Sequence, residues 1–509
     1  MTRVLGAVLS GVDGIAVEVE VRIGSQLPRI EVIGLPEAAV RESAARVRAA
    51  VHAAGHRIPE RRVTVNLAPA SVRKSGAGLD LPIAIGVLAA SGAVEATSLP
   101  RLGLVGELAL DGRLRPVRGA LALALALRDA GCKRVVVPRA NGGEAALTPG
   151  LAVLPADDLG TVLRFVQTGL GLAAVPPIGP ERLPAPTCAG DLAEVRGQAR
   201  AKRALEIAAA GGHGLLLEGP PGSGKTMLAR RLPGLLPPLA FAEAVEATRI
   251  HGAAGRLGDA PIVRERPFRA PHHAASRAGL LGGGSPPRPG EASLAHHGVL
   301  FLDELPEFER TTLESLRQVL EERRVVVARA GGTCVFPADF QLVAAANPCP
   351  CGWRLSRFRD CSCSDASIAR YLARVSGPLL DRIDLHVSVP AVAWRELASE
   401  TPAGEASALV RARVLAARAR QRERLDRHGL RTNAEIADRA LDLLVDAAPE
   451  ARALLGRAVE KLRLSARAAR RLLRVARTIA DLEGAARVGA APMAEALGYR
   501  REGDAPGPP

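Results

Sequence analysis

The sequence of 509 residues contains few aromatic side chains, few lysines and no long apolar run. Phe, Trp and Tyr make up only 2% of the chain, so Ala, Val, Leu and Ile must build its cores. No stretch of about 20 uncharged apolar residues occurs, and we therefore expect no membrane span. The first residues enter a strand-like pattern without the apolar segment of a signal peptide, which favours a cytoplasmic protein.

Cysteine is also scarce, with seven in the chain, and this number does not suggest a disulfide framework. Four of them form the pattern C-x-C-x₉-C-x-C at Cys349, Cys351, Cys361 and Cys363. Four thiolates can complete a tetrahedral Zn²⁺ shell, although C-x-C is tighter than the usual C-x₂-C. A zinc site and a group of free, partly buried thiols are both open interpretations.

The formal net charge is +15, and only five of the 68 basic residues are lysine. A bias toward arginine is also typical of a GC-rich genome. The positive excess raises the local concentration of polyanions such as nucleic acid. Charge alone does not identify the partner.

The length predicts two to four domains. The pattern of strands and helices favours the α/β class. We expect an α/β domain at 1–175, a Pro-rich linker at 176–190 and an α/β core at 191–395. An Arg-rich helical region at 396–500 and a disordered tail at 501–509 would follow. In the core, apolar strands alternate with helical stretches, and this alternation predicts a parallel sheet.

A phosphate-binding loop follows the first strand of the core and precedes a helix. It comprises Gly219, Pro220, Pro221, Gly222, Ser223, Gly224, Lys225 and Thr226. Its backbone N–H groups and the helix N-terminus would face the phosphates of ATP. Lys225 would reach the β- and γ-phosphates, and the Thr226 hydroxyl would ligate Mg²⁺.

Carboxylates follow the second core strand, where open α/β sheets bind their ligands. We expect Asp303 to hold Mg²⁺ through its water shell and Glu304 to polarise the attacking water. Asn347, past the third strand, would orient this water or the γ-phosphate, although an Asn before Pro is also an ordinary turn former.

Two arginines are candidates for contacts with ATP across a subunit interface. Arg382 is the candidate arginine finger, and the alternative is a surface ion pair with Asp381 or Asp384. Arg467 is the candidate lid arginine, with Arg470 and Arg471 as competitors on the same basic helix.

Four stretches carry a family resemblance: FRAPHH at 268–273, PGEASLAH at 289–296, NPCPCG at 347–352 and SGPLLDRID at 376–384. Together with the phosphate loop, they resemble the YifB/ComM family of magnesium-chelatase-like AAA+ proteins over nearly the whole chain. The resemblance implies a Lon-protease-like N-terminal domain, an AAA+ core of the helix-2-insert clade and a helical lid. It also implies a hexameric ring that uses ATP and Mg²⁺ to drive DNA branch migration during natural transformation.

The Lon-like domain lacks the groups of a Ser–Lys protease. By alignment, Gly78 occupies the position of the nucleophile, and the position of the lysine falls near Leu121. Neither residue supplies a hydroxyl or an amine. We therefore expect this domain to have kept its fold without proteolysis.

Two basic segments are candidates for DNA contact. The first is the insert at 266–291, whose basic side chains are Arg266, Arg269, His272, His273, Arg277 and Arg288. The second is a predicted β-hairpin at 323–336, whose arginines could contact phosphates. A solvated loop is the alternative for the insert.

The alternative function is a chelatase-like subunit that remodels a metal-inserting partner. An ATP-dependent protease is disfavoured by the missing dyad.

Overall fold

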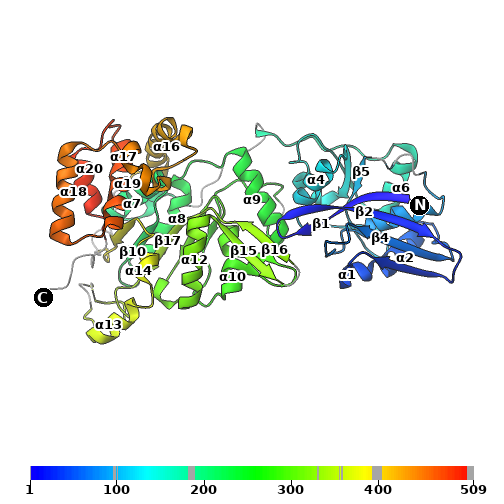
Figure 1. Ribbon diagram of the computed structural model, residues 1–509, viewed down its shortest axis with the longest axis horizontal. Helices are drawn as coiled ribbons and strands as arrows, with labels where there is room; N and C mark the ends of the chain where they lie inside the picture. The colour runs from blue at the N-terminus through cyan, green and yellow to red at the C-terminus, as the bar shows by residue number, and fades with distance from the viewer. Residues whose placement is uncertain are drawn as a thin grey trace.

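The computed structural model describes residues 2–500, except 96–98, 100, 181–189, 259, 330–331, 355, 357–358 and 393–403. The predicted tail, most of the predicted linker and the predicted boundary at 395 lie outside the described residues. The molecule is elongated, with the N-terminal domain at one end, the helical C-terminal region at the other and the core between them (Figure 1). Within the described part of the chain, no helix is both long enough and apolar enough to cross a membrane.

A seven-stranded mixed sheet forms the N-terminal domain, in the order β3-β4-β2-β1-β5-β8-β9. Alternate residues of β4, Val63, Val65 and Leu67, are buried, as the period-two pattern of the sequence predicts. The strands are β1 (Thr2–Ser10), β2 (Asp13–Ile23), β3 (Arg29–Ile33), β4 (Arg62–Ala68), β5 (Leu102–Leu104), β8 (Arg134–Pro138) and β9 (Ala152–Ala156).

Helices cover both faces of this sheet. On one face, α2 (Ser43–Ala53), α3 (Asp80–Ala90) and α6 (Leu159–Thr168) share a core with β1, β2 and β4. On the other face, α4 (Ala120–Asp129) packs on β1 and β2. Both cores consist mainly of Val, Leu, Ile and Ala, as the scarcity of aromatic residues requires.

The second sheet has five strands in the order β11-β14-β17-β10-β18, and every pair in it is parallel, as predicted. Its strands are β10 (Leu215–Glu218), β11 (Phe268–Arg269), β14 (Val299–Leu302), β17 (Gln341–Ala346) and β18 (Leu385–Ser388). Its principal helices are α7 (Ala199–Gly211), α8 (Lys225–Leu235), α9 (Phe241–Ala254) and α12 (Arg310–Glu322). The central strands β10, β14 and β17 are almost fully buried, which agrees with their continuous apolar runs.

Shorter elements surround this sheet. A small insert follows β11 and contains α10 (Arg277–Leu281), β12 (Gly282–Gly283), β13 (Arg288–Pro289) and α11 (Glu291–Leu294). The predicted hairpin forms from β15 (Arg324–Arg329) and β16 (Gly332–Pro337), which pair antiparallel. Two helices, α13 (Asp365–Leu372) and α14 (Gly377–Leu380), lie between β17 and β18 in the sequence.

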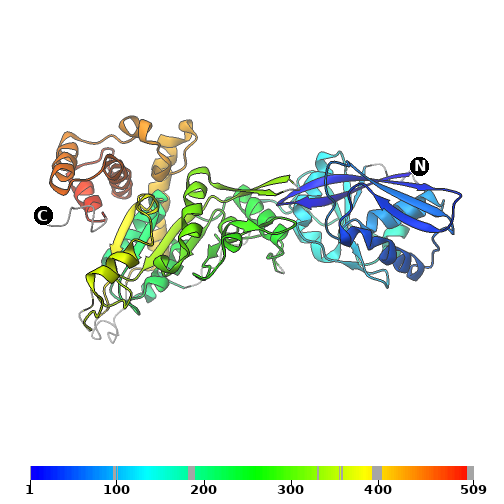
Figure 2. The same cartoon turned by 60° about the horizontal axis from the view of Figure 1, so that its bottom comes forward.

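The C-terminal region is helical, as predicted, and Figure 2 shows it at the end of the molecule opposite the N-terminal domain. Its helices are α16 (Ser407–Leu425), α17 (Leu441–Leu444), α18 (Pro449–Leu462), α19 (Ala466–Leu482) and α20 (Ala490–Leu497). Apolar residues of α16 and α19 join those of α7 and one face of the sheet in a single hydrophobic core. We call this region the lid.

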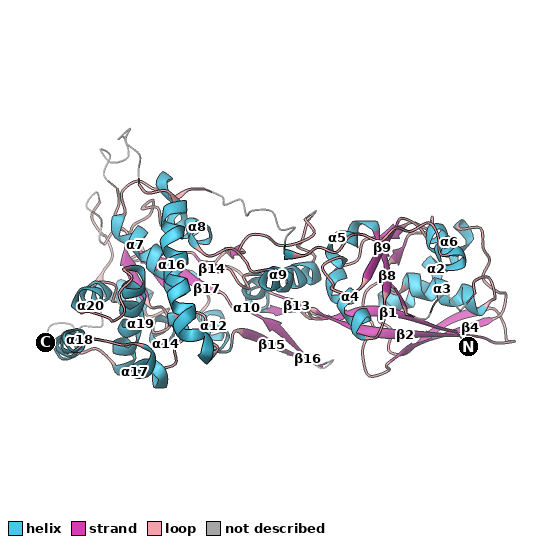
Figure 3. Cartoon of the chain, turned by 90° about the horizontal axis from the view of Figure 1, so that it is seen from above, coloured by secondary structure: helices cyan, strands magenta, loops and turns pink. Residues whose placement is uncertain are grey.

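Direct contacts join the N-terminal domain to the core. The Gly119 amide at the start of α4 donates to the carbonyl of Gly252 in α9 at 3.0 Å. Val12, in the turn between β1 and β2, is buried beside Phe336 of the hairpin. Figure 3 shows α9, β15 and β16 on the side of the core that faces the N-terminal domain.

Candidate nucleotide-binding site

The phosphate loop connects β10 to α8 and is shaped by glycines. Gly222 and Gly224 have φ angles of 74° and 91°, a region that other residues rarely adopt. A Cβ atom on Gly219 would lie 2.1 Å from the carbonyl oxygen of Val389, so no side chain fits there. The loop therefore runs closely against the end of the sheet and delivers its N–H groups to the start of α8.

The Lys225 amine lies inside this loop. It donates to the carbonyl oxygens of Gly219 and Pro220 at 2.7 and 2.9 Å and to Asn347 Oδ1 at 3.2 Å. Burial lowers the pKa of Lys225, and the carboxylates of Asp303, Glu304 and Glu218 oppose this shift. Two predicted site residues that are 122 positions apart, Lys225 and Asn347, thus lie in contact.

Thr226 and Asp303 also meet, since the Thr226 hydroxyl donates to Asp303 Oδ2 at 2.7 Å. The other Asp303 oxygen accepts the backbone N–H of Glu304 at 3.0 Å. A carboxylate can accept about four hydrogen bonds, so Asp303 has capacity left for a ligand. A hydroxyl beside a carboxylate is a donor set that suits Mg²⁺.

Ser223 also indicates that the loop fits a ligand. Its hydroxyl oxygen is buried and, among the described residues, has no hydrogen-bond partner. Buried polar atoms are rarely left without a partner. A polar group bound in the loop, such as a phosphate oxygen, would supply one.

Glu304 follows Asp303 in a left-handed backbone conformation with φ 52°. Such strain in a residue other than glycine is often found at functional sites. The carboxylate is half exposed, and His273 Nδ1 lies 3.3 Å from its Oε2 atom. The sequence alone places His273 only in a candidate DNA-contacting loop. Its position in the family stretch at 268–273 was the signal that could have linked it to the nucleotide site.

Arg382 and Arg467 lie together but away from the phosphate loop. Both line a cavity of about 920 Å³, and none of the described residues of 219–226 lines it. Arg382 pairs with Glu321, so neither Asp381 nor Asp384 is the partner that the sequence suggested. Arg467 Nη1 instead lies 3.5 Å from Asp381 Oδ2.

Two further arginines, Arg317 and Arg467, lie close enough to Arg382 to affect its pKa. Burial lowers the pKa of Arg382, and the guanidinium groups of Arg317 and Arg467 lower it further. The competitor Arg471 is buried and donates to the carbonyls of Leu380 and Ile383, on either side of Arg382. Arg470 pairs with Asp438 at 3.0 Å. Arg471 therefore supports the turn that carries Arg382.

The insert is less available to a partner than its basic composition suggested. Arg266 is largely buried and donates to the carbonyl oxygens of Pro237 and His297 at 2.5 and 2.6 Å. Arg269 forms a bidentate ion pair with Glu291, in which Nε and Nη2 donate to the two carboxylate oxygens at 2.6 and 2.9 Å. These two arginines thus bind other parts of the core, whereas Arg277 and Arg288 are exposed.

Two arginines of the hairpin also form ion pairs with carboxylates of the same chain. Arg323 lies 3.1 Å from Glu435, and Arg324 lies 3.2 Å from Glu322. The side chain of Arg329 lies outside the described part.

The N-terminal domain has room for a nucleophile at the predicted position but does not supply one. A Cβ on Gly78 would meet only Val117 and Val105, at the ordinary contact distances of 3.7 and 3.9 Å. Leu121 is fully buried in α4. The four clustered cysteines, Cys349, Cys351, Cys361 and Cys363, converge beside the nucleotide site.

A parallel sheet with a phosphate loop, an acidic strand end and a helical lid is typical of AAA+ ATPases. Models of magnesium chelatase subunit ChlI match residues 19–141 and 191–397, and a model of its C-terminal part matches 404–500. An uncharacterised protein of Mycobacterium tuberculosis is 44% identical over 98% of this chain and 99% of its own length. YifB of Escherichia coli and competence protein ComM of Haemophilus influenzae are each 43% identical, over 96% of this chain and 95% of their own. The chain belongs to the YifB/ComM family of magnesium-chelatase-like AAA+ ATPases.

Proposed function

We propose that this chain hydrolyses ATP as a ring of six identical subunits and couples hydrolysis to DNA translocation and branch migration. The observation that carries the proposal is the meeting of Lys225, Thr226 and Asp303 with Asn347 at one end of the parallel sheet. A cation, a hydroxyl, a carboxylate and an amide at such an edge are the groups that phosphoryl transfer requires.

Each group has a separate role in this proposal. The phosphate loop and Lys225 bind the phosphates, while Asn347 orients the γ-phosphate or the attacking water. Glu304 polarises this water, and His273 holds the carboxylate through its contact at 3.3 Å. Thr226 and Asp303 would hold Mg²⁺, which neutralises charge on the β- and γ-phosphates when it is bound.

The position of Arg382 supports a ring. In its own chain Arg382 lines a different cavity from the phosphate loop, together with Arg467. An arginine finger supplied by a neighbouring subunit would complete the site and stabilise the charge of the transition state. Arg467 would contact the same nucleotide from the lid.

Arg277 and Arg288 are the proposed DNA contacts, because they are the exposed arginines of the insert. Guanidinium contacts with phosphates are independent of sequence, which suits a motor that moves along DNA. A relative named competence protein ComM is in keeping with DNA as the substrate.

The N-terminal domain is proposed to be non-proteolytic, and peptide cleavage by pure protein would contradict this.

The test is ATPase activity with and without branched DNA. We expect DNA to stimulate the wild type, while Lys225→Ala stays inactive with DNA. The alternative, a chelatase-like subunit that remodels a protein, predicts no stimulation. An Arg277→Ala/Arg288→Ala double variant should lower the salt slope of DNA binding by about 2. An Arg57→Ala/Arg61→Ala variant removes the same charge from exposed sites of the N-terminal domain and should keep the slope.

A further inference from the structure

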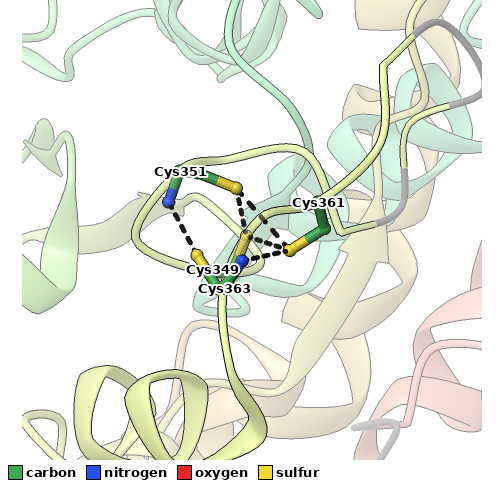
Figure 4. Close-up of side chains that lie close together, drawn as sticks. All are labelled: Cys349, Cys351, Cys361 and Cys363. Atoms are coloured by element: carbon green, nitrogen blue, oxygen red, sulfur yellow. Dashed lines mark hydrogen bonds between the residues drawn. The ribbon is translucent and has the colours of Figure 1, made fainter.

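Four cysteine side chains converge where β17 leaves the sheet (Figure 4). The Sγ atom of Cys349 lies 3.4 Å from that of Cys351 and 3.6 Å from that of Cys361. Cys351 and Cys361 are also 3.6 Å apart at their sulfurs, and all four Sγ atoms, including that of Cys363, lie within 4.8 Å of one another. The chain thus gathers four sulfurs around one point.

These distances fit a single metal ion. A disulfide would bring two sulfurs to about 2.0 Å, which is far shorter than the separations seen. A tetrahedral ion with metal–sulfur bonds of about 2.3 Å places its sulfurs about 3.8 Å apart. An iron–sulfur cluster distributes its thiolates over several iron atoms and would spread them more widely. Four thiolates without an open position are typical of structural Zn²⁺.

Backbone N–H groups are directed at two of the sulfurs. The amide of Cys351 donates to the sulfur of Cys363, and the amide of Cys363 donates to the sulfur of Cys361, both at 3.4 Å. Such bonds share the negative charge of thiolates and orient them toward a metal. The chain therefore provides the outer contacts as well as the four ligands.

The cysteine cluster is joined to the nucleotide site by a tight turn. Cys349 follows Asn347 by two residues, and the Gly352 amide donates to the Cys349 carbonyl at 2.9 Å. Gly352 has a φ of 82°, and a Cβ there would lie 2.6 Å from Pro221 Cδ and 3.8 Å from Asn347 Cγ. The turn thus rests on the phosphate loop and on the amide that contacts Lys225.

We propose that Cys349, Cys351, Cys361 and Cys363 bind one Zn²⁺ ion, and that this ion fixes Asn347 and Pro221 in the positions needed for ATP hydrolysis. The metal site stands on the sulfur geometry alone, whereas its effect on hydrolysis rests on the proposed function. In this role the ion would be a positioning element, since four thiolates would complete its shell and leave no open position for nucleotide or water.

The metal site is tested by measuring metals in the purified full-length chain. Mass spectrometry of the metals should find about one zinc per chain and no stoichiometric iron. A Cys361→Ser/Cys363→Ser variant should lose the zinc, whereas Cys334→Ser, which removes a partly exposed thiol on the hairpin, should keep it. Wild-type protein without zinc, with iron in its place, or with zinc that survives in the double variant would overturn the site.

Gly352→Ala tests the effect on hydrolysis without removing a ligand. The new methyl group would collide with Pro221, so we expect zinc to stay while turnover at saturating ATP falls about 10²-fold. Depleting the protein of zinc and then restoring Mg²⁺ should lower turnover to a similar extent. Adding zinc back should recover the turnover. A merely structural ion would change the unfolding temperature but leave the turnover of folded protein intact, and that result would overturn the positioning role.

The two proposals fail in different ways. Zinc content is measured without nucleotide, so a zinc-loaded chain that never hydrolyses ATP would reject the proposed function and keep the metal site. An active chain without zinc would reject the metal site and keep the proposed function.

Discussion

Both α/β units of the chain contain a hydrogen-bonded carboxylate, Asp80 at the start of α3 and Asp303 after β14, but the two differ in how many further hydrogen bonds they can accept. In the N-terminal domain, the buried Asp80 carboxylate accepts four hydrogen bonds, from the Ser43 hydroxyl, from Arg46 twice and from the Leu108 amide. In the core, Asp303 accepts two such bonds, from Thr226 and from the Glu304 amide. A carboxylate accepts about four, so Asp80 is saturated and Asp303 is not.

This difference separates a stabilising group from a binding group. A saturated, buried carboxylate holds its own domain together and has no bond to offer a ligand. An unsaturated one beside a glycine loop and a lysine can bind a substrate or an ion. We therefore expect substitutions at the nucleotide site of the core to change the rate of hydrolysis, and substitutions around Asp80 to change the stability of the N-terminal domain.

The largest effect is expected from Arg382→Ala, which would extend the comparison to a neighbouring subunit. Loss of an arginine finger typically costs about 10³–10⁵ in rate, and ATP binding should persist. Mixing this variant with Lys225→Ala should restore part of the activity, because each Lys225→Ala subunit offers an intact finger to its neighbour. Mass spectrometry must show mixed rings. Wild-type activity of Arg382→Ala on its own would show that Arg382 is not the arginine finger.

Glu304→Gln should reduce hydrolysis about 10²–10⁴-fold and leave nucleotide affinity unchanged, because only the group that polarises water is altered. Lys225→Ala should instead weaken binding, since it removes the cation from the phosphate loop. Fluorescent nucleotide titration and a phosphate-release assay separate the two effects. Wild-type hydrolysis by Glu304→Gln would show that the assigned carboxylate is wrong.

Asp80→Ala should destabilise the N-terminal domain without changing turnover in the folded protein. Removing one partner of a buried ion pair costs about 3–5 kcal/mol, because Arg46 would keep its charge without its partner. Asp157→Ala is the matched control, since it breaks an exposed pair with Arg139 and should cost less than about 1 kcal/mol. Calorimetry measures both. Loss of turnover below the unfolding transition of Asp80→Ala would show that Asp80 does more than stabilise its domain.

The sequence predicted the groups that are fixed by local motifs, and it missed those that depend on distant contacts. The strand at 299–302 was found from its short apolar run, and the hairpin from two strand-like runs around Gly331 and Gly332, because both signals are local. The meeting of Lys225 with Asn347 could be expected because parallel strands end at one edge. The burial of Arg266 could not be expected from the sequence, since the carbonyl groups that it contacts come from separate loops. For the same reason no pattern identified Glu321 as the partner of Arg382.

The smallest expected effect concerns Glu144, which lies between the two compared units. Its carboxylate accepts the Leu121 amide at 3.1 Å, and a Cβ on Gly252 of α9 would lie 2.4 Å from its Oε1 atom. Burial raises the pKa of Glu144 to about 7, against the opposing effect of the Leu121 and Ala120 amides. The folded chain therefore keeps a proton that the unfolded chain releases near pH 4.5, and stability should fall as pH rises from about 4.5 to about 7.

Glu144→Gln removes this dependence, because the amide carries no charge at any of these pH values. The resulting change in the free energy of unfolding is at most about 3–4 kcal/mol, since each pKa unit corresponds to about 1.4 kcal/mol. The variant should thus gain thermal stability over the wild type at pH 8 and lose that advantage at pH 5. Glu60→Gln, at an exposed glutamate of the same domain, should show no such change. If the thermal unfolding midpoints of the wild type and of Glu144→Gln change in parallel from pH 5 to 8, the carboxylate is not buried against α9. The N-terminal domain would then be joined to the core less closely than the contact between Gly119 and Gly252 implies.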